Sequence, residues 1–460
     1  MHPGNKMSAA ELRASLSLAS IFGLRMLGMF VILPVFAIYA EHLKGGDNLT
    51  LVGLALGAYG LTQAILQFPF GWLSDRYGRK PVIYIGLAIF ALGSFVAAAA
   101  DDIYIVILGR VLQGSGAISA AVIAMVADLT REEQRTKAMA MIGSTIGLTF
   151  AVSLVASPWL NQLIGVPGIF AMTGVLSLLA MAVVYAVIPD VPAPDAAPAP
   201  RVAPGFARVL RDPQLARLNF GILALHAVLM ALFIVVPLSL RDAGLAVDHH
   251  WQIYLPVMLG SIVLMLPLML IAERRGHVKP VFAGAIALLL LGQLTMPWLL
   301  HGVEGIAVFL LIFFTAFNLL EAMLPSLTSK LAPPGARGAA IGVYSSVQFL
   351  GTFVGAVSGG FLYGHFGARG VFVFDAVLLS AWLVLAAGMQ APARVLTRTF
   401  TIPLLDSAQA RSLSARIEAQ PGVREVQLAA GERTAYLKVD AAGFDEQVVL
   451  GLIEDATLSA

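Results

Sequence analysis

Residues 71–80, GWLSDRYGRK, concentrate charge in an otherwise apolar chain. The acid suits a helix N-terminus, where backbone N–H groups lack partners. The glycines permit a tight turn and a close approach of helices, and the bases can pair with acids or set membrane orientation. A generic basic loop is the plainer alternative. The candidate residues of this loop are Gly71, Asp75, Arg76, Gly78, Arg79 and Lys80.

Four ionisable residues lie inside long apolar segments: Arg25, Arg110, His226 and Glu321. A charge at the bilayer centre costs about 2.5–3.5 kcal/mol, so each needs a reason to be there. Glu321 suits a group that loads and releases protons, and His226 titrates near neutral pH. Arg25 keeps its proton and suits holding a carboxylate, an anion or a substrate dipole. For all four, the alternative is an ordinary helix-to-helix hydrogen bond.

Intramembrane amides add candidates for the lining of a cavity. Gln63 and Gln67 are four residues apart, and Asn318 precedes Glu321 by one turn, so each pair shares a helix face. Interhelical hydrogen bonds explain such amides equally well. Asp375 lies near the outer end of the last span, where water reaches it, and is discounted.

The composition indicates a polytopic membrane protein. Of 460 residues, 58% are hydrophobic and 12% charged, and the mean hydropathy is +0.85. A net charge of +2 gives no general attraction to nucleic acid, and the absence of cysteine excludes disulfides, thiolate metal sites and cysteine nucleophiles. No metal cluster, acid pair or nucleophile–base set emerges in the loops, which argues against an enzyme.

Twelve segments approach the length of about 20 apolar residues that a membrane span needs. They are residues 15–40, 50–70, 81–100, 103–127, 136–160, 167–188, 217–240, 252–272, 279–300, 305–329, 338–363 and 370–390. Thr130 and Glu133 form a T-x-x-E capping box that predicts the start of the fifth span. Lys and Arg crowd the loops on one side, and the opposite loops hold Lys44, Arg241 and Arg369, so both termini are predicted to be cytoplasmic.

The predicted domains are two six-helix bundles, residues 1–188 and 217–390, joined by a cytoplasmic linker, 189–216, and followed by a small domain, 391–460. A repeat supports the two halves, because Pro69, Asp75, Arg76 and Gly78 recur as Pro267, Glu273, Arg274 and Gly276. The tail reads β-α-β-β-α, as in a ferredoxin-like domain whose fourth strand is missing or extremely short at Ala460. The edge of its sheet is therefore open to a partner. Self-association is one possible role of this domain, and the alternative is a tail without a binding role.

The ordered pattern at residues 71–80 resembles motif A of the major facilitator superfamily. In the fourth predicted span, Arg110, Gln113, Gly114 and Gly116 resemble motif B of that family. Gly143 and Gly147 resemble the spacing of the antiporter motif C, although Leu148 departs from it. The resemblance implies an all-α fold of twelve transmembrane helices in two pseudo-symmetric halves, with Arg110 near a proton site and Gln113 in the cavity.

The likeness is strongest to proton-coupled exporters that carry an appended C-terminal domain. It implies that Asp75 faces the N-terminus of span 11 and that Arg79 reaches Asp128, as a latch on the outward-facing state. The expected function is proton-driven efflux of a small amphipathic compound across the bacterial inner membrane, with no cofactor, metal or nucleic acid. The partners are lipid, substrate and protons. Uptake by a symporter or facilitator, and sensing through the tail, remain alternatives.

Overall fold

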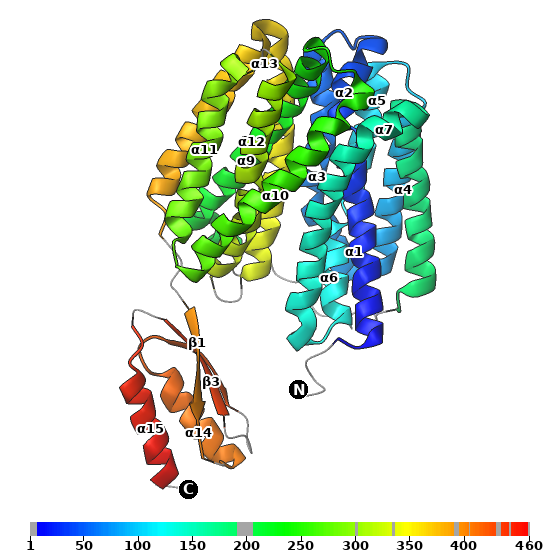
Figure 1. The fold of residues 1–460 in the computed structure, drawn as a ribbon. Coiled ribbons are helices and arrows are strands. Elements are labelled where there is room, and N and C mark those ends of the chain that lie inside the picture. Colours follow the sequence, from blue (N-terminus) through cyan, green and yellow to red (C-terminus); the bar gives the residue numbers. More distant parts are fainter. Residues whose placement is uncertain are drawn as a thin grey trace. The chain divides into compact units, whose positions relative to one another are not determined.

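A computed structural model of the chain describes most of its residues. They are residues 7–190, 206–299, 302–333, 336–390, 395–403, 405–428, 434–440 and 443–458. The chain divides into two compact units, Met1–Met389 and Gln390–Ala460. The first unit is helical, and Figure 1 shows its helices as two groups, coloured blue to green before the linker and green to orange after it.

Helices of the first group lie within residues 7–190, here called the N-terminal half. They are α1 (Ala9–Phe30), α2 (Leu33–Tyr39), the 3-10 turn η2 (Ala40–His42), α3 (Leu49–Tyr77), α4 (Arg79–Ala98), α5 (Ile103–Ser115), α6 (Ser119–Leu129) and α7 (Glu132–Val187). The first and fourth predicted spans each consist of two helices. Pro34 stands in the first turn of α2, where a proline fits because its missing N–H group needs no partner.

The C-terminal half comprises residues 206–389. Its helices are α8 (Phe206–Arg211), α9 (Pro213–Asp242), the 3-10 turn η3 (Val247–His249), α10 (Trp251–Arg274), α11 (Val278–Leu299), α12 (Val303–Leu331) and α13 (Arg337–Ala387). The predicted linker thus contains a short helix, α8, while residues 191–205 lie outside the described residues.

Ten described helical segments are long and apolar enough to cross a membrane. Two of them, Lys137–Val187 and Arg337–Ala387, have 51 residues each, and a straight helix of that length would measure about 75 Å. Each turns back at a glycine with positive φ, Gly165 at 66° and Gly367 at 64°, a conformation that side chains disfavour. Each therefore supplies two crossings, and the described residues contain the twelve predicted spans.

The second unit has its own core, formed by residues such as Phe400, Leu413, Leu437 and Val449. Its elements are β1 (Val395–Thr401), α14 (Ser407–Glu418), β2 (Val423–Leu428), β3 (Thr434–Asp440) and α15 (Glu446–Leu458). The sheet is antiparallel in the order β1-β3-β2, so the predicted β-α-β-β-α order is confirmed. Ala460, where a short fourth strand was expected, lies outside the described residues.

Asp406 caps α14 and gives a test of the small domain. The backbone N–H groups of Gln409 and Ala408 donate to its carboxylate and hold its pKa below the ordinary range. Since the pKa is lower in the folded state, this stabilisation is complete above about pH 4, the ordinary pKa of Asp, and is lost as pH falls through the folded value. We expect Asp406→Ala to speed hydrogen exchange of the α14 amides at pH 7, measured by mass spectrometry. Equal exchange in variant and wild type would contradict the cap.

Candidate functional site

The charged loop joins α3 to α4, and Arg79 is its centre. Its Nε donates to Asp128 Oδ2 at 3.0 Å, and Nη1 donates to Ser74 Oγ at 2.7 Å and also contacts Asp75. The Arg79 side chain is 16% exposed and that of Asp128 is 36% exposed. The predicted contact between Arg79 and Asp128 is therefore present. We call Asp75, Arg79 and Asp128 the motif A triad, and the end of the helices where it lies the motif A end.

The other motif A residues make separate contacts. Lys80 Nζ lies 2.7 Å from Asp190 Oδ1, at the start of the predicted linker. The guanidinium of Arg76 lies 5.4 Å from the centre of the Trp72 ring, as in a cation–π contact. Gly71 faces Ala120 of α6. All these residues belong to the N-terminal half.

Asp75 does not make the implied contact with span 11. Among the described residues its hydrogen-bonding partner is Arg79, and the side chain is 48% exposed. The reason lies in the packing of α3 against α13, which begins span 11 at Arg337. At the motif A end the closest approach to Gly342 of α13 is through the ring of Phe68, and Gly338 has open space around it. Within the described residues the Asp75 carboxylate is thus paired with Arg79 and not with the start of span 11.

Farther from the motif A end, α3 and α13 pack backbone to backbone. A Cβ atom added to Gly53 would lie 2.2 Å from the Ala356 carbonyl oxygen, one on Gly60 would lie 2.7 Å from that of Phe349, and one on Gly360 would lie 2.1 Å from that of Leu49. We call this contact the glycine seam. The halves are thus in close backbone contact along the seam, whereas near the motif A end α13 meets α3 through the ring of Phe68.

An ion pair also joins the halves at the far end. Arg241, at the end of α9, donates from Nη1 to both carboxylate oxygens of Glu41 at 2.8 and 2.7 Å. Glu41 belongs to η2, so the pair links the first span of one half to the first span of the other. Both side chains are partly exposed. Their attraction adds to the glycine seam in closing this end.

The two buried arginines bind neutral groups. Arg25 donates to Gln63 and, at 3.3 Å, to Ser119 Oγ. Its Nε has no partner among the described residues. The observed contacts of Arg25 are thus those of the helix-to-helix alternative, and they use Gln63, one of the predicted cavity amides.

Arg110 occupies a second buried cluster. It donates to Gln113 Oε1 at 2.7 Å and to the Gly28 carbonyl at 3.2 Å, and its guanidinium lies 4.9 Å from the centre of the Tyr59 ring. Gln113 in turn donates to Ser94 Oγ at 2.8 Å. Arg110 Nη2 has no hydrogen-bond partner within the described part of the chain, as is the case for Arg25 Nε.

Gln67 and Asn318 differ from what their spacing suggested. Gln67 is buried, with its Oε1 unpartnered among the described residues, whereas Gln63, four residues earlier, is hydrogen bonded to Arg25. Asn318 donates to Ser261 of α10 at 3.0 Å, while Glu321 contacts α13. A shared helix face therefore does not bring either pair to a shared partner.

The structure brings Glu321 and His226 together through a residue that sequence reasoning missed. Gln348 of α13 donates from Nε2 to Glu321 Oε1 at 3.2 Å and lies 2.9 Å from His226 Nε2. His226 Nε2 is 3.9 Å from Glu321 Oε2. Three helices, α9, α12 and α13, thus meet at one polar site, the Glu321 site. The only signal in the sequence was a glutamine within an apolar span.

Aromatic rings connect the Glu321 site to the boundary between the halves. Phe150, from α7 of the N-terminal half, contacts Phe233, Phe314 and Phe317 of the C-terminal half, with ring centres 5.9–6.4 Å apart. Phe317 also lies 5.9 Å from the His226 ring. A movement of one half against the other must therefore change the packing beside the Glu321 site.

The burial of Asp375 differs from the expectation. The residue was discounted as water-accessible, but it is fully buried, and both carboxylate oxygens lack hydrogen-bond partners in the described structure. The reason is that Asp375 lies on the core face of its span with Phe372, Leu379 and Trp382, which are also buried. Within the described residues, no three His, Cys, Asp or Glu side chains are grouped as a metal site requires.

Comparison with known proteins decides the family. A family model described as Major Facilitator Superfamily matches residues 18–315 and 250–400. The chain belongs to the major facilitator superfamily. A second model, described as the YajR YAM domain, matches residues 401–443 of the small unit.

Relatives agree with this assignment. The inner membrane transport protein YajR of Escherichia coli K12 is 43% identical over 444 residues, which cover 95% of this chain and 96% of that protein. Multidrug resistance protein MdtH of Aeromonas hydrophila is 25% identical, over 74% of this chain and 85% of that protein. A bacterial homologue of the human lysosomal transporter Spinster, solved in an inward-facing and occupied conformation, shares the fold with a TM-score of 0.68 at 14% identity, covering 83% of this chain and 97% of that one.

This major facilitator is therefore a multi-pass membrane transporter and not an enzyme. Transporters of the superfamily generally need no cofactor. The two halves, the glycine seam and the buried polar clusters are the parts that such a transporter has available to bind and move a small molecule.

The ion pair at the far end gives a prediction about state. The chain has no cysteine, so Ala356→Cys introduces a single thiol into the glycine seam. We expect Glu41→Gln to raise the rate at which a membrane-impermeant maleimide labels this thiol about two- to fivefold, because a partly exposed ion pair contributes up to about 1 kcal/mol. Asp47→Asn, an exposed acid near the same end, is the control. An unchanged rate for Glu41→Gln would show that the pair does not help close this end.

Proposed function

We propose that this transporter exports a small amphipathic compound in exchange for protons, by rocking its N-terminal half against its C-terminal half. The observation that carries the proposal is the Glu321 site. It places a partly buried carboxyl group in hydrogen-bonding contact with Gln348 and close to the buried His226. Such a group can exchange a proton with little rearrangement of its neighbours.

Proton exchange at this site has a route to conformation. A protonated Glu321 can donate to Gln348, whereas an ionised one accepts from it, so the hydrogen bonds of α13 change with protonation. The neighbour of Gln348, Phe349, is part of the glycine seam, and Phe317 links His226 to Phe150 of the other half. Both connections support a proposal in which the proton shifts the balance between states.

The contacts of Asp75 support a role for the motif A triad in the conformational cycle. In the arrangement seen, the motif A triad is formed but Asp75 makes no hydrogen bond with span 11. We infer that closing the motif A end brings the N-terminus of span 11 to Asp75, where a carboxylate is favoured by the helix dipole. The triad would then stabilise the outward-facing state. This role rests on the family resemblance and on the observed geometry.

Localisation and topology follow as proposals. YajR is an inner membrane transport protein, and the basic loops of this chain lie at the motif A end. We propose the inner membrane, with both termini and the motif A end in the cytoplasm. The domain division proposed is residues 1–188, 189–216, 217–390 and 391–460.

The small domain is proposed to self-associate. In the described residues β1 and β2 each pair with β3 alone, which leaves two strands with an open edge. We expect deletion of residues 391–460 to abolish chemically cross-linked dimers in membranes while transport continues. Dimers that persist after deletion would exclude this surface.

Transport in vesicles tests the function. Inverted membrane vesicles should accumulate a fluorescent amphipathic dye, chosen by a screen, only when a proton gradient is imposed. We expect Glu321→Gln to remove the pH dependence of this flux, because glutamine cannot exchange a proton. Glu304→Gln, an exposed acid in the first turn of the same helix, is the matched control.

Three results would contradict parts of the proposal. Equilibration of the dye without a gradient would exclude proton coupling. A pH profile that Glu321→Gln leaves unchanged would exclude Glu321 as the proton carrier. Accumulation by right-side-out vesicles alone would indicate uptake in place of export.

A further inference from the structure

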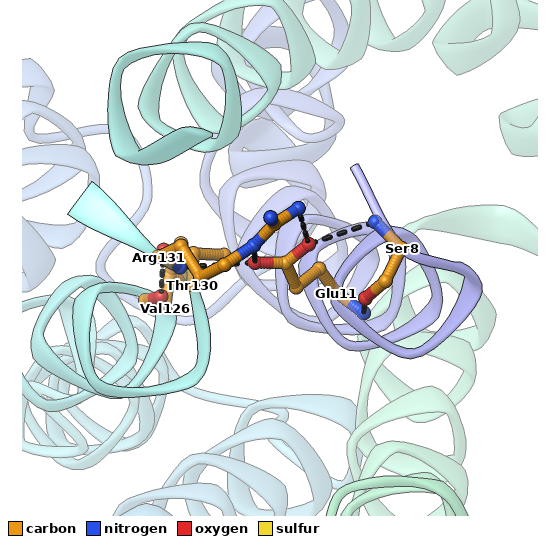
Figure 2. Close-up of polar contacts among 5 residues, drawn as sticks. All are labelled: Ser8, Glu11, Val126, Thr130 and Arg131. Atoms are coloured by element: carbon orange, nitrogen blue, oxygen red, sulfur yellow. Dashed lines mark hydrogen bonds and ion pairs between the residues drawn. The ribbon is translucent and has the colours of Figure 1, made fainter. Parts of the chain in front are cut away.

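Glu11 binds the residue that precedes a distant helix. Figure 2 shows its carboxylate between the start of α1 and Arg131, the residue that precedes α7. Oε1 accepts from the backbone N–H of Arg131 at 3.0 Å and from its Nε at 2.9 Å, and Oε2 accepts from its Nη2 at 3.0 Å. The Glu11 side chain is only 8% exposed. We call this contact the Glu11 clamp.

The same carboxylate also serves its own helix. Oε2 accepts from the backbone N–H of Ser8 at 2.7 Å, and Ser8 Oγ accepts from the backbone N–H of Glu11 at 3.2 Å, which completes a capping box. Glu11 therefore satisfies backbone donors at the starts of two helices that are 120 residues apart. Two-point hydrogen bonding of a guanidinium by a carboxylate fixes orientation as well as distance.

The predicted capping box at Thr130 and Glu133 stays a prediction, because the Glu133 side chain lies outside the described residues. The Thr130 hydroxyl donates backward to the Val126 carbonyl at 2.6 Å, and the cap position of α7 is Arg131, with no side-chain capping bond of its own. One backbone donor at the start of α7, the N–H group of Arg131, is satisfied from α1. Figure 2 shows the two contacts together, with Thr130 bound to Val126 and Arg131 bound to Glu11.

These contacts surround the segment that carries Asp128. Asp128 lies in the last turn of α6, three residues before Arg131. Arg79 holds it at 3.0 Å from the side of α4, and the Glu11 clamp holds the following turn from the side of α1. The position of the Asp128 carboxylate is therefore set from two directions by ion pairs.

We propose that Glu11 is a positioning residue for the motif A triad, and that it acts by fixing the turn after Asp128 to the first span. The proposal rests on the proposed alternating-access function. Without the clamp, the turn loses its attachment to α1 through the Arg131 guanidinium, and Asp128 is free to shift from Arg79. The triad would then stabilise the outward-facing state less well.

Single-cysteine labelling tests this in the full chain in membranes. Gly338→Cys places a thiol at the exposed start of span 11, where no atom lies within 4 Å, and this thiol should be protected when the motif A end closes. We expect Glu11→Gln to raise its labelling rate by a permeant maleimide about two- to fivefold, and Asp128→Asn to act in the same direction. The double variant should equal Asp128→Asn alone, since both act through one triad.

Further variants separate positioning from helix capping. Ser8→Ala removes the hydroxyl cap of α1 but leaves the Glu11 clamp, so it should not change labelling. Arg131→Gln removes the guanidinium and should behave like Glu11→Gln, which keeps the test valid if one variant folds poorly in a thermal unfolding assay. Effects of Glu11→Gln and Asp128→Asn that add in full, or a Ser8→Ala effect as large as that of Glu11→Gln, would overturn the proposal.

The same samples also test the proposed function separately from the role of Glu11. If wild-type labelling at Gly338→Cys does not respond to an imposed proton gradient, proton coupling of the conformational change is contradicted. The comparison of Glu11, Asp128 and their double variant is made without a gradient, so it still decides whether Glu11 positions Asp128.

Discussion

The structure depends on one constraint: hydrocarbon offers no hydrogen bonds, so polar groups inside the membrane must find partners within the protein. Arg25 meets an amide and a hydroxyl, Arg110 meets an amide and a carbonyl, and Glu321 meets Gln348. The Arg110–Gln113 contact lies within α5, and the other contacts join different helices. The same rule that makes such residues costly also makes them the points at which helices are held in register.

The two ends of the molecule use this constraint differently. At the far end, backbone contact through the glycine seam does most of the closing and the Glu41–Arg241 pair is partly exposed. At the motif A end, charged side chains organise the loops within the N-terminal half, through the motif A triad and the Glu11 clamp. Backbone packing thus dominates the contacts at the far end, and ion pairs dominate those at the motif A end. Ion pairs suit an end whose contacts change in response to small differences in free energy.

The sequence predicted features that depend on local pattern and failed where distant residues meet. Hydropathy predicted twelve spans, and the family resemblance predicted the contact of Arg79 with Asp128. Neither could reveal Gln348, because a glutamine in an apolar span does not show which residue it faces. Thr130 and Glu133 suggested a local cap, but no local pattern could show that Glu11, far away in the chain, binds Arg131 at the start of α7. The burial of Asp375 was mispredicted because it was estimated from the position of the residue along the span, and not from the face of the helix on which the residue lies.

The reversals at Gly165 and Gly367 have a mechanical consequence. Each turn consists of a single residue, so the two helices that it joins move together as one helical hairpin. The first arm of each hairpin lies between the halves, carrying Phe150 in one case and the seam of α13 in the other. The second arm presents exposed apolar residues such as Val175, Leu178, Val377 and Val384 to lipid. Movement of either hairpin relative to the rest of the protein therefore also displaces apolar surface that faces the bilayer.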